Sequence, residues 1–301
     1  MYINPLVSVV IPTYNRPQYI CRAIDSCFSQ VDVNVEVIVV DDNGLGSEAQ
    51  KAVEKMLMGY AQKENFLYIP HERNKNGAAA RNTGIRASKG KFIAFLDDDD
   101  WFEPRKISKQ LAKMADDNTK ACLCGFRRLY GEETVEGNPD NKDLSYRILL
   151  GNVDSCAGSG LIVEKQLALD INGFQENFVR RQDVEFLYRV SKRTDVSVVK
   201  EMLLNVFMHS GNLKKNHSKD IAGVVSFLDS FKADIDSYPR RKRDAIWDAN
   251  YLELSKLELK DKHILKSLKW LYKSPHKFKN LSLLVNSAIS FYNRLSRYNK
   301  V

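Results

Sequence analysis

The stretch Phe92-Ile93-Ala94-Phe95-Leu96-Asp97-Asp98-Asp99-Asp100 joins an apolar run to four consecutive acidic residues. A short apolar run of this kind is typical of a buried strand in a parallel sheet, and the aspartates come directly where the strand would end. Two similar runs precede it: residues 7–11 end in Pro12, and residues 35–40 end in Asp41-Asp42. Each of these three strands is therefore predicted to carry polar side chains at its carboxyl end.

Helical periodicity occupies the intervals between these strands. One helix is predicted after Asn15 and Pro17, a second after Ser47, and a third over residues 78–88, closed by Gly90. Alternating strands and helices indicate an open, doubly wound α/β sheet, which binds ligands beyond the carboxyl ends of its strands. Further strands are predicted over residues 66–69, 121–129, 161–163, 196–199 and 203–208, with a helix over 184–191.

The four aspartates indicate either a metal site or a solvated acidic loop. Adjacent carboxylates raise one another's pKa unless a cation neutralises them, and Mg²⁺ or Mn²⁺ binds carboxylates together with nucleotide phosphates. In the alternative, Asp99 or Asp100 would interact favourably with the N-terminal end of a following helix. Two classes of enzyme are disfavoured. Asp100-Trp101-Phe102 departs from the aspartyl-phosphate phosphatases, and residues 12–16 replace the glycine-rich loop of nicotinamide-binding folds.

Composition favours an ordinary globular chain. Of 301 residues, 44% are hydrophobic and 28% charged, which allows one large domain with an appendage, or two domains. The five cysteines lack C-x-x-C spacing, so we expect reduced thiols and a reducing compartment. We expect neither secretion nor a membrane span, because no signal segment opens the chain and no apolar run reaches about 18 residues.

The positive charge lies in the C-terminal region. Residues 239–301 hold 15 Lys+Arg against 5 Asp+Glu, within a chain of net charge +8. Nucleic-acid binding is disfavoured, because it would require basic and aromatic residues across the α/β part. We predict a domain over residues 1–215 and a basic helical extension over 216–301. The expected apolar stripe either packs on the main domain or contacts an anionic membrane surface; its first helix has Ile264, Leu265, Leu268 and Leu271 beside Lys266, Lys269 and Lys273.

Six short motifs, in order, resemble those of the inverting nucleotide-sugar glycosyltransferases of family 2, which have the GT-A fold. The resemblance covers residues 6 to about 210 and implies a Rossmann-like mixed sheet that binds a nucleotide-sugar. The motifs are Val9-Val10-Ile11-Pro12-Thr13-Tyr14-Asn15-Arg16, Val39-Val40-Asp41-Asp42, residues 76–85 (NGAAARNTGI), Phe95-Leu96-Asp97-Asp98-Asp99-Asp100, Gly173-Phe174-Gln175-Glu176 and Asp183.

The resemblance implies roles for particular residues. Asp42 is similar to the carboxylate that accepts the uracil N3 proton, Asp183 to the catalytic base, and Gln182 stands where a Glu is usual. Asp99 and His209 are implied ligands of Mn²⁺ or Mg²⁺, although the residues around His209 match the family poorly. The implied nucleotide-sugar contacts are Pro12, Thr13, Tyr14, Arg16, Asp42, Arg81, Asp97 and Asp98.

These observations predict a metal-dependent, inverting transfer of a hexose from a UDP-sugar. The expected acceptor is a saccharide, in particular one linked to a lipid diphosphate, in bacterial O-antigen or capsule assembly. The expected location is cytoplasmic, with peripheral contact at the inner face of the plasma membrane. The alternatives are a nucleic-acid-binding protein and a sugar-binding module without catalysis, which would need a broken D-x-D motif or base.

Overall fold

The computed structural model describes residues 6–178, 180–208 and 216–284. They divide into two compact units, one of residues 6–145, 153–178 and 180–208 and one of residues 146–152 and 216–284. The first unit contains the strands β1 (Leu6–Thr13), β2 (Asn34–Asp41), β3 (Phe66–Pro70), β4 (Phe92–Phe95), β5 (Trp101–Phe102), β6 (Ala121–Tyr130), β7 (Glu133–Gly137), β8 (Ile162–Glu164) and β9 (Val196–Phe207). Its helices are α1 (Ile20–Phe28), α2 (Glu48–Leu57), α3 (Gly77–Ala87), α4 (Lys106–Asp116), α6 (Ala157–Gly160), α7 (Lys165–Asp170) and α8 (Gln182–Ser191).

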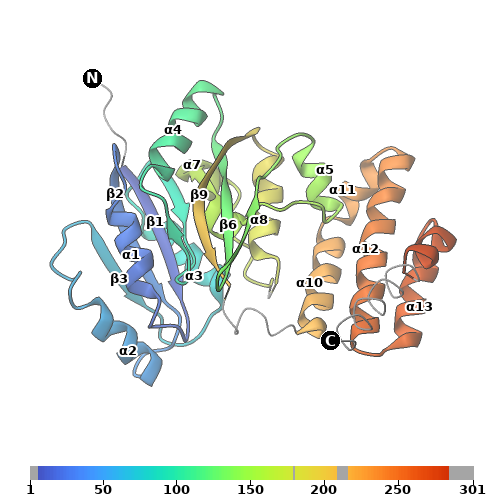
Figure 1. The fold of residues 1–301 in the computed structure, drawn as a ribbon, viewed down its shortest axis with the longest axis horizontal. Helices are drawn as coiled ribbons and strands as arrows, with labels where there is room; N and C mark the ends of the chain where they lie inside the picture. The colour runs from blue at the N-terminus through green and yellow to red at the C-terminus, as the bar shows by residue number, and fades with distance from the viewer. Residues whose placement is uncertain (1–5, 179, 209–215, 285–301) are drawn as a thin grey trace. The chain divides into compact units, whose positions relative to one another are not determined.

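The strands of the first unit form one mixed sheet (Figure 1). Their order is β3-β2-β1-β4-β8-β6-β9-β5, and β7 pairs with β6. The first four strands are parallel, whereas β8 runs antiparallel to both β4 and β6. The α/β fold with a mixed sheet predicted from the sequence is confirmed. The parallel half brings the ends of β1, β2 and β4 to one edge, as expected for a ligand site.

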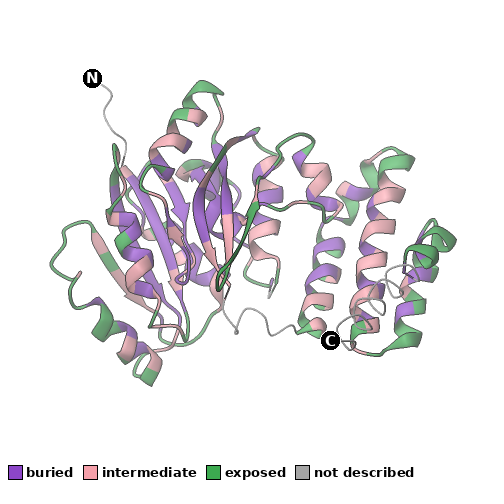
Figure 2. Ribbon diagram, in the orientation of Figure 1, coloured by how far each residue is buried: buried purple, intermediate pink, exposed green. Residues whose placement is uncertain are grey.

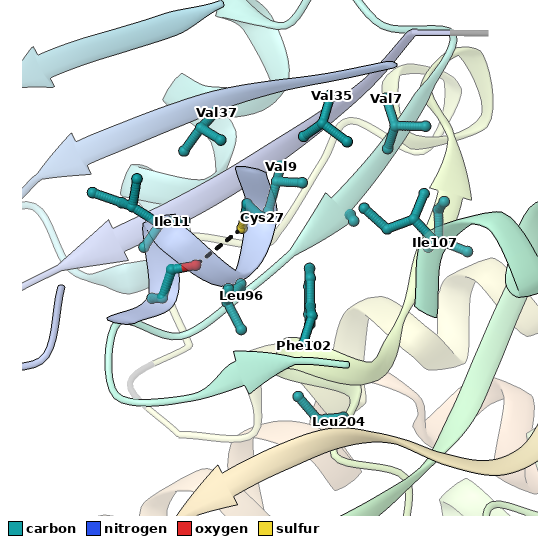
Figure 3. Packing of buried hydrophobic residues seen from close by; sticks show 14 of the residues in the cluster. Val7, Val9, Ile11, Cys27, Val35, Val37, Leu96, Phe102, Ile107 and Leu204 are labelled. Carbon is teal, nitrogen blue, oxygen red and sulfur yellow. Dashed lines mark hydrogen bonds between the residues drawn. The ribbon is translucent and has the colours of Figure 1, made fainter. Parts of the chain in front are cut away.

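Buried β-branched side chains of β1 and β2 pack together and stabilise the strands whose ends form this edge. Val9 and Ile11 of β1 pack with Val37 of β2 and Cys27 of α1 on one face of the sheet (Figure 3). Burial raises the pKa of the Cys27 thiol to about 12, so this sulfur is an inert packing group. All five cysteines are free thiols.

Two glycines fix the position of α3, which carries part of the expected ligand site. A Cβ at Gly84 would stand 2.2 Å from Val10 Cγ1, so only glycine lets α3 approach β1 this closely. Gly173 adopts a φ of +62° in the turn before Phe174, whose backbone N–H donates to Asn82 Oδ1 over 2.7 Å. The predicted motifs around residues 82 and 173 are therefore joined in space.

The structure corrects one expectation about the later strands. Residues 196–199 and 203–208 were expected to form two strands, but β9 runs through both. The register against β6 shifts around Gly125, so the ladder passes an irregularity without ending. In the described part of the chain, no helix has both the length and the apolar character needed to cross a bilayer.

The second unit is helical. It contains α10 (His217–Ser230), α11 (Lys232–Ser237), α12 (Arg240–Lys260) and α13 (Ile264–Lys273), and α5 (Leu144–Leu149) extends into it from the first unit. Residues 146–152 belong here although the sequence predicted a boundary only near 215. Asn250 of α12 explains their place, since its buried side chain donates a 2.7 Å hydrogen bond to the Leu149 carbonyl. The expected C-terminal helices are present.

Candidate active site

A cavity of about 290 Å³ lies beyond the carboxyl ends of β1, β2 and β4. It brings together every residue predicted to contact a nucleotide-sugar except Asp98, which is fully buried and does not line the cavity. Its lining residues are Pro12, Thr13, Tyr14, Arg16, Asp42, Asn74, Asn76, Gly77, Ala80, Arg81 and Asp97.

Asp42 is held by the loop that follows β3. Its Oδ1 accepts from the Lys75 backbone N–H at 2.8 Å and lies 2.8 Å from His71 Nδ1. Its Oδ2 accepts from Asn74 Nδ2 and from the Asn76 backbone N–H, both at 2.8 Å. A carboxylate has about four lone-pair sites, so these four contacts fill its ordinary capacity. Asp42 could therefore accept a nucleobase N–H only by sharing or exchanging one of these partners.

His71 was not singled out in the sequence; it is buried, with its ring against the Asp42 carboxylate. Arg86 donates to Thr83 Oγ1 at 3.2 Å, and Thr83 Oγ1 lies 3.0 Å from His71 Nε2. Because an ionised Asp42 can only accept, His71 Nδ1 carries the proton in this contact. The chain of contacts from Arg86 through Thr83 and His71 fixes the orientation of Asp42.

Asp97 and Asp98 point to different partners. The side chain of Asp97 is about 35% exposed, and its Oδ1 accepts from Arg81 Nη2 at 2.5 Å. Asp98 is fully buried and accepts a 2.7 Å hydrogen bond from Thr13 Oγ1. Burial raises the pKa of Asp98 to about 7, although the positive charge of Arg16 and the Thr13 hydroxyl both oppose that shift.

Asp99 and Asp100 are also satisfied by different groups. Asp99 Oδ2 forms an ion pair with Arg16 Nη1, and its backbone carbonyl accepts from Arg22 at 2.6 Å. Asp100 accepts from Ser159 Oγ at 2.6 Å and from the Phe207 backbone N–H at 3.1 Å. Burial raises the pKa of Asp100 well above its ordinary value, and the nearby charges of Asp97 and Asp99 add to the shift. Asp100 therefore joins the aspartate loop to α6 and β9.

The donor set suits a hard divalent cation, although the protein alone does not enclose one. Among the residues that the structure describes, no three His, Cys, Asp or Glu side chains converge as a ready metal site. Mg²⁺ and Mn²⁺ commonly need only one or two carboxylates beside nucleotide phosphates. Asp98 Oδ1 is a buried oxygen that accepts no hydrogen bond from the residues that the structure describes. It forms an ion pair with Arg16 Nη2 at 2.7 Å. The other expected ligand, His209, lies outside the described residues.

A second cavity, of about 310 Å³, contains Asp183. Asp97 lines both cavities, so it lies at their common border. Arg81, which pairs with Asp97, also has Nη1 3.4 Å from Gln182 Oε1, beside Asp183 in the first turn of α8. The second cavity is lined by Asp97, Asp100, Arg128, Val153, Asp154, Ser155, Cys156, Gly158, Ser159, Asp183, Val184 and Val206.

The surroundings of Asp183 in the second cavity stabilise its protonated, neutral form relative to an aspartate in water. Burial raises the pKa of Asp183, Arg81 opposes the shift, and the negative charge of Asp97 adds to it. A carboxylate of raised pKa is a stronger base than a free aspartate. Arg128 was not singled out in the sequence; it pairs with Asp154 Oδ2 at 3.0 Å, across 26 positions of sequence.

Residues 8–169 match the family described as Glycosyl transferase family 2, which is more than half of the 301 residues. The chain belongs to this family. An uncharacterized glycosyltransferase of Methanocaldococcus jannaschii is 36% identical over 210 residues, which cover 67% of this chain and 70% of the relative. The resemblance to family 2 stated from the sequence motifs is thus confirmed.

Two further similar proteins are described with different nucleotide-sugar donors. The Escherichia coli protein WfgD, described as a UDP-Glc:alpha-D-GlcNAc-diphosphoundecaprenol beta-1,3-glucosyltransferase, is 27% identical over 194 residues, 64% of this chain and 73% of its own length. The mannosyltransferase PcManGT of Pyrobaculum calidifontis, solved with GDP-Man and Mn²⁺, has a TM-score of 0.62 at 16% identity and covers 99% of this chain and 84% of its own. This likeness establishes the GT-A type of fold.

The residues that match family 2 cover only part of the described structure. The matched residues include the aspartate loop but end before Asp183 and before the helices α10 to α13. For several curated relatives the aligned region spans only about a third of the relative's length. The roles of individual residues thus depend on the geometry of this chain.

Proposed function

We propose that the protein is an inverting glycosyltransferase that moves a hexose from a UDP-sugar to a saccharide acceptor. The observation that carries this proposal is the placement of Asp97 on the border of two cavities. One cavity gathers the predicted donor-binding residues, and the other contains the proposed base, Asp183. A sugar seated between them would expose its anomeric carbon to an acceptor on the side away from the nucleotide.

The proposed chemistry needs a base and a means of stabilising the leaving group. Asp183 accepts the proton of the acceptor hydroxyl as the hydroxyl attacks, and its raised pKa suits that role. Arg81 donates to Asp97 and to the Gln182 side-chain amide, so it orients the Asp97 carboxylate and the residue that precedes Asp183. A divalent cation held by Asp99 would stabilise the negative charge on the leaving diphosphate.

The acceptor we propose is a sugar linked to a lipid diphosphate, in O-antigen or capsule assembly. The name of WfgD supports this class of acceptor. The charge of the second cavity restricts the acceptor further, because its lining includes the basic Arg128 and four acidic residues, Asp97, Asp100, Asp154 and Asp183. Such a surface suits the hydroxyls of a neutral sugar and repels a phosphate. In this proposal the diphosphate lies outside the cavity, and the protein acts at the cytoplasmic face of the membrane as a peripheral enzyme.

A donor screen tests the proposal. Hydrolysis and transfer should be measured for UDP-Glc, UDP-Gal, UDP-GlcNAc, UDP-GalNAc and GDP-Man, each with Mn²⁺ and with a chelator. We expect one UDP-sugar to be consumed, and only when Mn²⁺ is present. Consumption of GDP-Man alone would refute the UDP preference and leave a glycosyltransferase; consumption of no donor, with UDP nevertheless bound, would support a sugar-nucleotide-binding module.

A further inference from the structure

The helix α13 has apolar residues on two different sides, and one of these sides is exposed. Its packed side meets α12, where Ser255 Oγ lies 2.6 Å from Ser267 Oγ and the rings of Tyr251 and Trp270 stack with centroids 6.0 Å apart. The other side presents Leu265 and Tyr272, which are 83% and 76% exposed, with Leu268 between them. Their i, i+3, i+7 spacing places them in one stripe. Figure 2 shows both buried (purple) and exposed (green) stretches on this helix.

The turn after α13 extends this stripe. Asp248 of α12 holds the turn, because its carboxylate accepts from the His276 backbone N–H at 2.9 Å and its carbonyl accepts from Asn280 Nδ2 at 2.9 Å. Phe278 lies in the helical residues 277–284 that follow this turn and is 79% exposed. The ammonium of Lys277 lies 4.7 Å from the Tyr272 ring and 5.8 Å from the Phe278 ring, so the two rings share one cation. We call the exposed set the α13 patch: Ile264, Leu265, Leu268, Tyr272, Phe278 and Leu281.

The charged residues of α13 itself are all positive. Lys266, Lys269 and Lys273 follow one another at helical spacing along its edge, and all three are exposed. No Asp or Glu follows Asp261 in the sequence. A second copy of the chain would bring these lysines against one another, which opposes self-association through this face. Exposed leucines and aromatic rings beside lysines instead match the interface of an anionic bilayer, where the rings enter the headgroup region and the amines meet the phosphates.

We propose that the α13 patch docks on the surface of a bilayer containing anionic lipid. The inference rests on the peripheral location included in the proposed function, and it names the residues responsible. Docking is independent of the donor site, so binding is measured without donor or acceptor. A failure to bind lipid would leave glycosyl transfer untouched, and a failure of transfer would leave docking untouched.

The experiment is co-sedimentation of the full chain with vesicles of phosphatidylcholine alone or mixed with phosphatidylglycerol. We expect binding to the mixed vesicles that weakens as salt is added. The variant K266Q/K269Q/K273Q should bind about 100-fold less tightly, since each lysine near such a surface contributes about fivefold. The charge-matched control K51Q/K55Q/K192Q removes three exposed lysines of the first unit and should bind like the unaltered protein.

A second pair of variants tests the apolar part. L265S/L268S should lose most vesicle binding with unchanged thermal unfolding, because both leucines are exposed; L45S/M58S, at two exposed apolar positions of the first unit, should retain it. Equal vesicle binding by L265S/L268S and the unaltered protein would overturn the proposal. So would a dimer in sedimentation velocity that these substitutions dissociate, because the α13 patch would then be covered by a second copy.

Discussion

Arg16 forms ion pairs with both Asp98 and Asp99, the second and third of the four consecutive aspartates. Its guanidinium thus contacts Asp99 Oδ2, an oxygen that the proposed metal ion would need. The neighbouring Arg22 instead donates to the Asp99 backbone carbonyl. Its guanidinium carbon lies 3.9 Å from the centroid of the Trp101 ring. Arg16 is thus a counter-ion of the aspartate loop, and a divalent cation at Asp99 would compete with it.

Replacing Arg16 by Ala should therefore separate stability from metal affinity. Without metal, R16A should unfold more easily by about 1.5–3 kcal/mol, because buried carboxylates lose a charged partner. Mn²⁺ should raise its melting temperature more than that of the unaltered protein, since the Arg16 guanidinium no longer competes for Asp99. Differential scanning fluorimetry over a Mn²⁺ titration measures both effects. R22A is the matched control, and equal Mn²⁺ stabilisation of R16A and the unaltered protein would exclude the competition.

Replacing His71 should affect donor binding more than turnover. In H71A, Asp42 loses a buried partner and the loop of residues 71–76 loses its link to α3 through Thr83. We expect the donor KM to rise about tenfold, equivalent to about 1.4 kcal/mol, with little change in kcat. In H71N the amide can donate from near the Nδ1 position and should recover most of the loss. A fall in kcat alone, or no difference between H71A and H71N, would contradict this positioning role.

The sequence located the edge of the sheet and most of the donor cavity, because both follow from local patterns. Apolar runs predicted β1, β2 and β4, and the parallel alternation placed their polar ends together. The partners of those ends were not predictable in the same way. His71 follows β3 as an isolated histidine, and only the wrapping of residues 71–76 around Asp42 gives it a role. Arg128 and Asp154 pair only because β6 carries Arg128 to the rim of the second cavity.

In the helical unit, the periodicity of the sequence did not predict which side of α13 is packed. The sequence placed Ile264, Leu265, Leu268 and Leu271 on a single apolar face. In the structure Leu271 is buried, whereas Leu265 is 83% exposed. A helical repeat identifies apolar positions, but when apolar residues cover more than one side it cannot say which side packs. That choice depends on long-range contacts such as Ser255 with Ser267.

Replacing Asp183 by Asn should separate binding from chemistry. The amide keeps the shape of the side chain but cannot take the acceptor proton, so kcat should fall about 10²- to 10⁴-fold with donor affinity nearly unchanged. Isothermal titration with UDP and steady-state kinetics with the preferred donor measure the two quantities.

The control is E176Q, since Glu176 is exposed and its Oε1 accepts from Asn82. Glu185 is a poor alternative base, because it is fully buried and ion-paired with Arg189. A kcat for D183N within about threefold of the unaltered enzyme would remove Asp183 from the mechanism.

The pH dependence of kcat provides an independent test of the same base. Asp183 acts only when ionised, and burial together with Asp97 raises its pKa, so activity should be lost as pH falls through a value above the ordinary aspartate pKa of about 3.9. Arg81 lowers that pKa, so R81Q should shift the acidic limb to still higher pH at saturating donor, whereas R193Q, an exposed change just after α8, should leave the limb in place. The residual activity of D183N should show no such limb. An acidic limb at or below the ordinary value, or one that persists in D183N, would assign the titration to another group and leave the raised pKa of Asp183 without a catalytic role.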